Sequence, residues 1–376
     1  MKKIIIFLLV FVMVPSVVYA QDFDFNLEDY ENQLASYDLS VFEKTLDNNT
    51  KSILKDLNID NFSVENIANL SLNDFFMILK NLIAGKIELP LKAGFEILVF
   101  ILLSSFIQTF KNSVDNSLEN FYSTLSGLVL IIILVSKLSV SLAVANSTIN
   151  LCADFVYAFV PVFGLILVSS GGIVTAGSTN TFLLLLSQAL SFISSTIFLP
   201  LINCFLAIGT CSSLNAEYKL SGVTQSMKTI IIKIVSVVCA LFVSILSIKT
   251  AVSAKADAMG LRSIRFAINS VVPIIGPSIS EGLLSIQSYS SLIKTSVGVV
   301  GVIAIAFVFL PSIIEITLWR FVLTACYTVS NLFNDRCVSD LLGIFKDTFL
   351  LVNVLLILSM LTTVISFGLL IATKTG

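Results

Sequence analysis

Five charged side chains interrupt or border the long apolar runs of this chain, and they have the clearest capacity for chemistry. Lys137 lies near the middle of the apolar run 125–145, whereas four others lie near the ends of such runs: Glu96, Lys233, Glu315 and Arg320. A charge in hydrocarbon is expensive and tends to face a bundle interior or a watery path. Side chains near the end of a run can instead extend their charge to the membrane surface. Lys137 is therefore the candidate intramembrane charge.

The absence of histidine from the sequence removes most other reactions. It excludes a Ser-His triad, a histidine proton relay and nearly every zinc site. No G-x-x-x-x-G-K-[ST] segment occurs, which excludes nucleotide hydrolysis by a P-loop. The six cysteines show no C-x-x-C spacing, which favours packing over metal binding. We therefore expect no enzyme activity, no cofactor and no metal site, and the lack of a long basic patch predicts no nucleic-acid partner.

The most specific local motif is the segment 161–172, which places Pro161 and the run Ser169, Ser170, Gly171 and Gly172 inside an apolar stretch. Proline and adjacent glycines interrupt a regular helix, and serine side chains can satisfy the backbone groups that the interruption frees. Broken helices in membrane proteins commonly line cavities or serve as hinges. These five residues form the candidate hinge or cavity motif, and a simple kink is the alternative.

Long apolar runs must position these residues. Hydrophobic residues make up 56% of the chain and charged residues 12%, about half the charge of a typical soluble domain. A bilayer core of about 30 Å requires about 20 helical residues, and a helix satisfies its backbone groups within one segment. The sequence therefore predicts an all-α, polytopic helical membrane protein. The multi-span membrane domain is 91–376, and its expected spans are 93–110, 125–145, 157–175, 182–209, 230–248, 297–317 and 349–372.

The segment 249–296 sets the expected orientation of these seven spans. Its charges are mostly basic, with Lys249, Lys255, Arg262, Arg265 and Lys294 against Asp257 and Glu281. Basic loops stay in the cytoplasm, so we expect a cytoplasmic loop here and a cytoplasmic C-terminus. Eight spans with an exterior C-terminus is the alternative.

Helical spacing of apolar residues on both sides of Pro273 predicts two amphipathic helices within this loop. We expect them to lie on the membrane surface or to contact a partner. Packing beneath the helical bundle is the alternative.

The start of the chain has the features of a secretory signal peptide. Lys2 and Lys3 precede a short apolar run, and Ala20 follows a residue pattern typical of a cleavage site, so 1–20 is expected to be removed. An uncleaved anchor is the alternative. The following segment, 21–90, holds 13 acidic residues against 5 lysines and is expected to be extracytoplasmic. Its apolar spacing predicts short helices, one of them running from Ser71 to about Gly85.

Two blocks of residues make the chain recognisable. The first is Pro161 followed by Ser169, Ser170, Gly171 and Gly172, and the second lies in the basic loop and consists of Asp257, Leu261, Arg262, Arg265, Phe266, Pro273 and Gly276. In the order and spacing of these residues, the chain resembles members of the stage III sporulation protein AE family. The second block is the candidate partner-facing surface of the cytoplasmic loop.

That resemblance implies a function that the residues alone do not. It implies an integral subunit of a secretion-like channel complex, placed in the mother-cell membrane around the forespore and needed for late forespore gene expression. The implied partners are other membrane proteins of the stage III sporulation complex, the lipid bilayer and, indirectly, a secretion-type ATPase and a forespore-membrane partner. From the broken helix and Lys137, a self-sufficient solute permease is the alternative.

Overall fold

A computed structural model describes residues 34, 36–37, 40–56, 72–111, 116–214, 221–271, 276–333 and 335–372. Every regular element within those ranges is a helix, which confirms the all-α prediction. The expected signal peptide, 1–20, lies outside the described residues.

Three short helices precede the long ones within the described ranges. They are α3 (Ser40–Thr45), α4 (Asn48–Asp56) and α6 (Leu72–Lys86). The Asp47 side chain accepts a hydrogen bond from the Thr50 backbone N–H at 3.2 Å, which satisfies one of the free donors at the start of α4. The helix expected near Ser71–Gly85 is confirmed as α6. Both α4 and α6 pack against α12, whereas α3 packs against α8.

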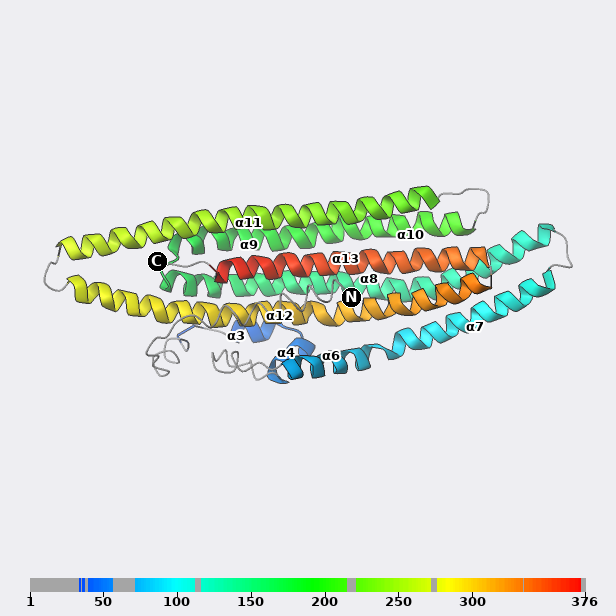
Figure 1. The fold of residues 1–376 in the computed structure, drawn as a ribbon, viewed down its shortest axis with the longest axis horizontal. Helices are drawn as coiled ribbons and strands as arrows, with labels where there is room; N and C mark the ends of the chain where they lie inside the picture. The colour runs from blue at the N-terminus through cyan, green and yellow to red at the C-terminus, as the bar shows by residue number, and fades with distance from the viewer. Residues whose placement is uncertain are drawn as a thin grey trace.

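The long helices run side by side with nearly parallel axes (Figure 1). In chain order they are α7 (Glu88–Lys111), α8 (Asn116–Ser169), α9 (Ile173–Ile193), the π-helix η2 (Ser194–Phe198), α10 (Leu199–Leu214), α11 (Ser221–Val271), α12 (Gly276–Leu332) and α13 (Arg336–Ile371). The segments α9, η2 and α10 follow one another without a turn and form a single rod.

Helices α12 and α13 form the centre of the bundle. Aromatic residues fill the space around them: the Phe159 ring lies 5.1 Å from that of Phe367, and the Trp319 ring stacks 5.9 Å from Phe349. Glycine allows close approach at this level, because a Cβ on Gly298 would lie only 2.5 Å from Ile371. Burial of such side chains is the main stabilising contribution available to the centre.

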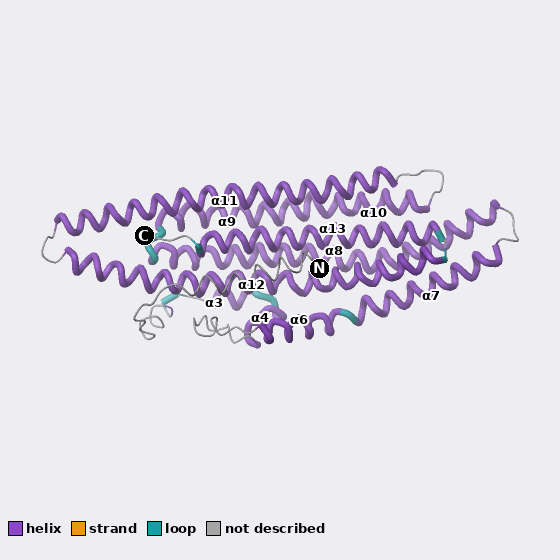
Figure 2. The backbone as a smooth tube through the Cα atoms, in the orientation of Figure 1, coloured by secondary structure: helices purple, strands orange, loops and turns teal. Residues whose placement is uncertain are grey.

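Six helices in the described part of the chain are long and apolar enough to cross a membrane, where the sequence predicted seven spans. The difference arises in α8, a 54-residue helix that contains both 125–145 and most of 157–175. Figure 2 shows α8 without a turn between them. No glycine or proline occurs at 146–156, so nothing there ends the helix. The assignment of these two segments to separate helices was therefore wrong.

The segment 249–296 is not a separate loop carrying surface helices. Residues 249–271 continue α11 from its apolar part, and residues 276–296 begin α12. Residues 272–275, which include Pro273, lie outside the described residues. Pro277 lies in the first turn of α12, where its missing N–H breaks no hydrogen bond. The basic segment is thus two ends of long helices that form a hairpin.

The apolar stretches occupy two levels along the bundle. Gly298 lies beside Phe163 and Ile371, and the Thr148 and Ser312 hydroxyls are 2.6 Å apart. These contacts align 297–317 of α12 with 349–372 of α13 and 143–163 of α8, which we call the central layer. By contrast, Gly94 lies against Val322, so α7 and residues 116–142 of α8 extend past the central layer and form the distal layer. At 1.5 Å per residue, α8 is about 81 Å long, more than twice the thickness of a bilayer core.

Candidate functional site

The candidate hinge motif forms a sharp reversal between α8 and α9. Gly171 has a φ of +88° and ends α8 in the left-handed conformation that glycine adopts readily. The Gly172 N–H donates to the Leu167 carbonyl at 2.8 Å, and the Gly171 N–H donates to Val168 at 2.9 Å. This pair of bonds is a Schellman motif, which satisfies carbonyl groups at a helix C-terminus. The structure thus reverses the chain between two helices at a place where the sequence indicated an interruption within the single span 157–175.

Pro161 and the two serines contribute less to the reversal than their positions in the motif indicated. Pro161 lies inside α8, and the helix continues through it. The Ser169 and Ser170 hydroxyls donate to carbonyls of their own helix, Leu165 at 3.1 Å and Leu167 at 2.9 Å. The change of direction is thus concentrated at Gly171 and Gly172.

Asp257 of α11 caps the N-terminus of α9 from a distance of more than 80 residues in sequence. Its carboxylate accepts hydrogen bonds from the Val174 N–H at 2.6 Å and the Thr175 N–H at 2.9 Å. Gly172 offers no side-chain cap, so these donors depend on Asp257. The carboxylate is only 4% exposed, and its negative charge lies at the positive end of the α9 dipole.

Helices α11 and α12 both close on the glycine turn. A Cβ on Gly171 would lie 2.9 Å from the Leu261 side chain and 3.1 Å from the Gln287 amide nitrogen. The Arg265 guanidinium donates to the Gln287 Oε1 at 2.9 Å, which joins the two helices beside the turn. Gln287 was not among the residues singled out from sequence, because a lone glutamine in a polar segment carries no signal.

Further hydrogen bonds hold α11 to its neighbours on either side of this point. The hydroxyls of Ser178 and Ser253 are 2.6 Å apart and join α9 to α11. Nearer the hairpin turn, the Ser280 hydroxyl donates to the Asn269 Oδ1 at 3.0 Å and joins α12 to α11. The turn, Asp257, Leu261, Arg265 and Gln287 therefore form one site, which we call the α8–α9 joint.

The structure thus brings the two blocks of recognisable residues together in space, although about 90 positions separate them in sequence. Arg262, Phe266 and Gly276 of the second block are not part of the joint, and Pro273 lies outside the described residues. Arg262 and Phe266 are exposed on α11, Phe266 to 75%, and Gly276 is the first residue of α12.

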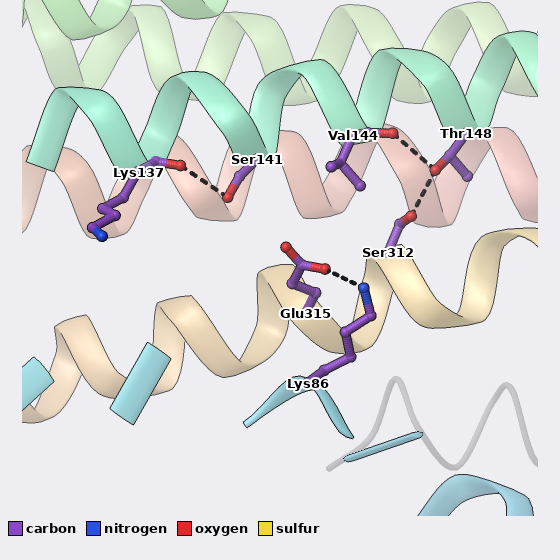
Figure 3. A network of polar contacts seen from close by, with 7 residues as sticks. All are labelled: Lys86, Lys137, Ser141, Val144, Thr148, Ser312 and Glu315. Atoms are coloured by element: carbon purple, nitrogen blue, oxygen red, sulfur yellow. Dashed lines mark hydrogen bonds and ion pairs between the residues drawn. The ribbon is translucent and has the colours of Figure 1, made fainter. Parts of the chain in front are cut away.

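Lys137 does not belong to the joint. It lies on α8 in the distal layer, half-buried, and Figure 3 shows its backbone carbonyl accepting a hydrogen bond from the Ser141 hydroxyl at 3.2 Å. In the same view, Lys86 of α6 pairs with Glu315 of α12 at 2.8 Å. Lys294, which the sequence placed in the basic loop, is only 2% exposed and lies one turn before Gly298 on α12.

The joint positions helices and offers no reactive group. Both oxygens of Asp257 already accept backbone hydrogen bonds, and no group of three or more potential metal ligands occurs within the described ranges. Three buried hydroxyls near the cap, those of Thr175, Thr179 and Thr250, have no hydrogen-bond partner among the described residues. Such groups are suited to bind ordered water.

These features define a class before they define a family: a polytopic helical membrane protein in which a remote carboxylate holds a broken helix pair. The sequence profile of the stage III sporulation protein AE family matches residues 55–374, and the chain belongs to that family.

A curated relative, stage III sporulation protein AE of Bacillus subtilis (strain 168), is 27% identical over 175 residues. The aligned part covers 46% of this chain and 44% of the relative, so the alignment spans less than half of either protein. No solved structure matches the chain.

Proposed function

We propose that the chain is an integral membrane subunit of the secretion-like channel complex that links mother cell and forespore, needed for late forespore gene expression. The observation that carries the proposal is the family match over residues 55–374. Family membership indicates a role in sporulation, and the six apolar helices indicate a multi-pass membrane protein. We propose, beyond this, that the chain belongs to the channel complex, lies in the mother-cell membrane and binds the partners of that complex.

The shape of the bundle supports a role in an assembly. The α11–α12 hairpin extends beyond the α8–α9 turn, as Figure 1 shows for the yellow segments. It carries exposed Arg262 and Phe266, a combination that suits contact with another protein. We place this end in the mother-cell cytoplasm, because its exposed charges include Lys255 and Arg262. The secretion-type ATPase of the complex would act on that side.

The experiment is deletion of the gene, followed by microscopy of sporulating cells that carry a late forespore reporter. Normal engulfment with a silent reporter and a stalled forespore is the expected result. Normal late reporter expression and normal spores would reject the proposal.

A self-sufficient solute permease is less well supported by the geometry than by the sequence. In broken-helix transporters the substrate site lies near the bilayer midplane. Here Phe163 marks the end of the central layer, and the break at Gly171 lies eight residues, or about 12 Å, beyond it. Lys137 lies in the distal layer, beyond the opposite end of the central layer. Flux by the purified protein alone in liposomes would nevertheless restore the permease hypothesis.

A further inference from the structure

A group of polar side chains lies on the outward surface where α8 packs against α9. Asn150 and Asp154 of α8 and Gln188 of α9 are exposed, and Ser191 is half-buried. The Ser191 hydroxyl donates to the Asn150 Oδ1 at 2.5 Å. Since α8 and α9 are antiparallel, this bond sets a register in which Gln188 lies opposite Asp154. We call these four residues the polar stripe.

The polar stripe lies at the middle of the central layer. Phe163 is level with Gly298, and Thr148 is level with Ser312, so Asp154 is level with about residue 306 of α12. Residue 306 is next to the centre of the apolar stretch 297–317, which is residue 307. Asp154 is therefore about 14 Å from one edge of the layer and about 16 Å from the other, at 1.5 Å per residue. A lysine or arginine at the membrane surface, or a lipid head group, is too far away to neutralise it.

Asp154 has no ion pair or hydrogen bond within the described part of the chain. Charged side chains at this depth are rare in membrane helices and almost always face a bundle interior, a watery cavity or a partner. The contrast with α11 is clear, because Leu241 at nearly the same depth is 56% exposed and compatible with lipid. The π-helix η2 begins three residues after Ser191, and such elements occur frequently at functional sites.

We propose that the polar stripe is the docking face for a membrane-spanning helix of another protein, one that presents a lysine or arginine to Asp154 at mid-depth. The proposal rests on the proposed function, in which the chain is one subunit among several. Amide and hydroxyl groups of Asn150, Gln188 and Ser191 would then bond across the helix pair, as polar residues do in membranes.

A second copy of this chain is the less suitable occupant. Two copies in one membrane related by a two-fold axis would place Asp154 against Asp154 at the same depth. Like charges facing each other across an interface oppose association. A helix of another protein that carries a lysine or arginine would instead form an ion pair with Asp154.

The experiment uses the full-length chain in membranes of sporulating cells, with a photo-crosslinking amino acid in place of Gln188. The matched control carries it in place of Leu241, which lies about 3 Å from the same depth on α11. We expect the Gln188 position, and not the Leu241 position, to yield an adduct with another membrane protein. Asp154→Leu should reduce that adduct at least fivefold, Asp154→Glu should retain it, and both should match the parent in membrane abundance.

Several results would overturn the proposal. One is an adduct formed only with lipid, with a second copy of this chain or with another segment of the same chain. Another is an adduct whose yield Asp154→Leu leaves unchanged. The third is a crosslinked partner whose membrane span contains no lysine or arginine. The forespore reporter separates this inference from the proposed function. A specific, Asp154-dependent adduct in cells whose late reporter does not need the gene would keep the docking face and reject the channel role, whereas a silent deletion strain without the adduct would do the reverse.

Discussion

Replacing Asp257 with alanine removes the side chain that holds the start of α9. The Val174 and Thr175 N–H groups would lose their acceptors in a place where the carboxylate is 4% exposed. Each buried donor left without a partner costs about 1–3 kcal/mol, and the lost charge at the helix N-terminus adds about 0.5–1 kcal/mol. We therefore expect Asp257→Ala to lower the free energy of unfolding by roughly 2.5–7 kcal/mol. Asp257→Asn keeps an acceptor for one donor and should lose about half as much.

Buried cysteines provide the assay. Cys152 and Cys239 are free and only 4% and 6% exposed, whereas Cys204 and Cys211 are exposed. In a background with Cys204→Ser and Cys211→Ser, a thiol-reactive fluorescent dye therefore reports unfolding of the detergent-solubilised chain on heating. A loss of about 3 kcal/mol corresponds to a fall in Tm of roughly 6–12 °C on the scale of domains of 150–250 residues. Lys255→Ala, an exposed change two residues earlier in α11, is the control and should shift Tm little. Equal Tm values for Asp257→Ala and Lys255→Ala would refute the remote-cap reasoning.

Three further changes test the packing by the same dye assay. Gly171→Ala forces a non-glycine residue to a φ of +88° and against its neighbours, and should lose roughly 1–3 kcal/mol. Gly298→Val overfills the contact with α13 and should lower the free energy of unfolding by a similar amount. The control is Gly282→Ala, which has nothing within 4 Å and should be neutral or stabilising. Equal losses of stability in these two variants would contradict the packing described. For the Lys86–Glu315 pair, a double-mutant cycle of Lys86→Ala and Glu315→Gln should give a coupling of about 1 kcal/mol, and zero coupling would mean that α6 does not dock on α12 as described.

Hydropathy was sufficient to predict the helical class and most of the long helices, but it misread one boundary. Apolar runs in α8 are separated by polar residues that include Asn146, Asn150 and Asp154, so hydropathy alone divides this helix into two expected spans. Polarity does not end a helix, whereas glycine, proline and capping residues do. The absence of glycine and proline at 146–156 was the signal that could have predicted one continuous helix.

The joint was predictable only in halves. The residue type of Gly171 and Gly172 alone indicates a break in the helix, because few other residues adopt a positive φ readily. The partner of that break, Asp257, is a carboxylate in a basic segment, and its role depends on a pairing of helices more than 80 residues apart in sequence. Local patterns carry no information about such a register, and only the family resemblance drew attention to Asp257.

The distal layer has a consequence for the lifetime of the protein in the cell. A bilayer core of about 30 Å cannot enclose both the central and the distal layer of a helix as long as α8. We therefore expect a neighbouring protein to cover residues such as Phe95 and Phe106 of α7, which are 70% and 63% exposed. A subunit without its neighbours would therefore expose a hydrophobic surface to quality-control proteases. Its abundance should follow the supply of its neighbours, and synthesis without them should yield a short-lived chain. Pulse-chase labelling with and without the other sporulation membrane proteins measures that dependence directly.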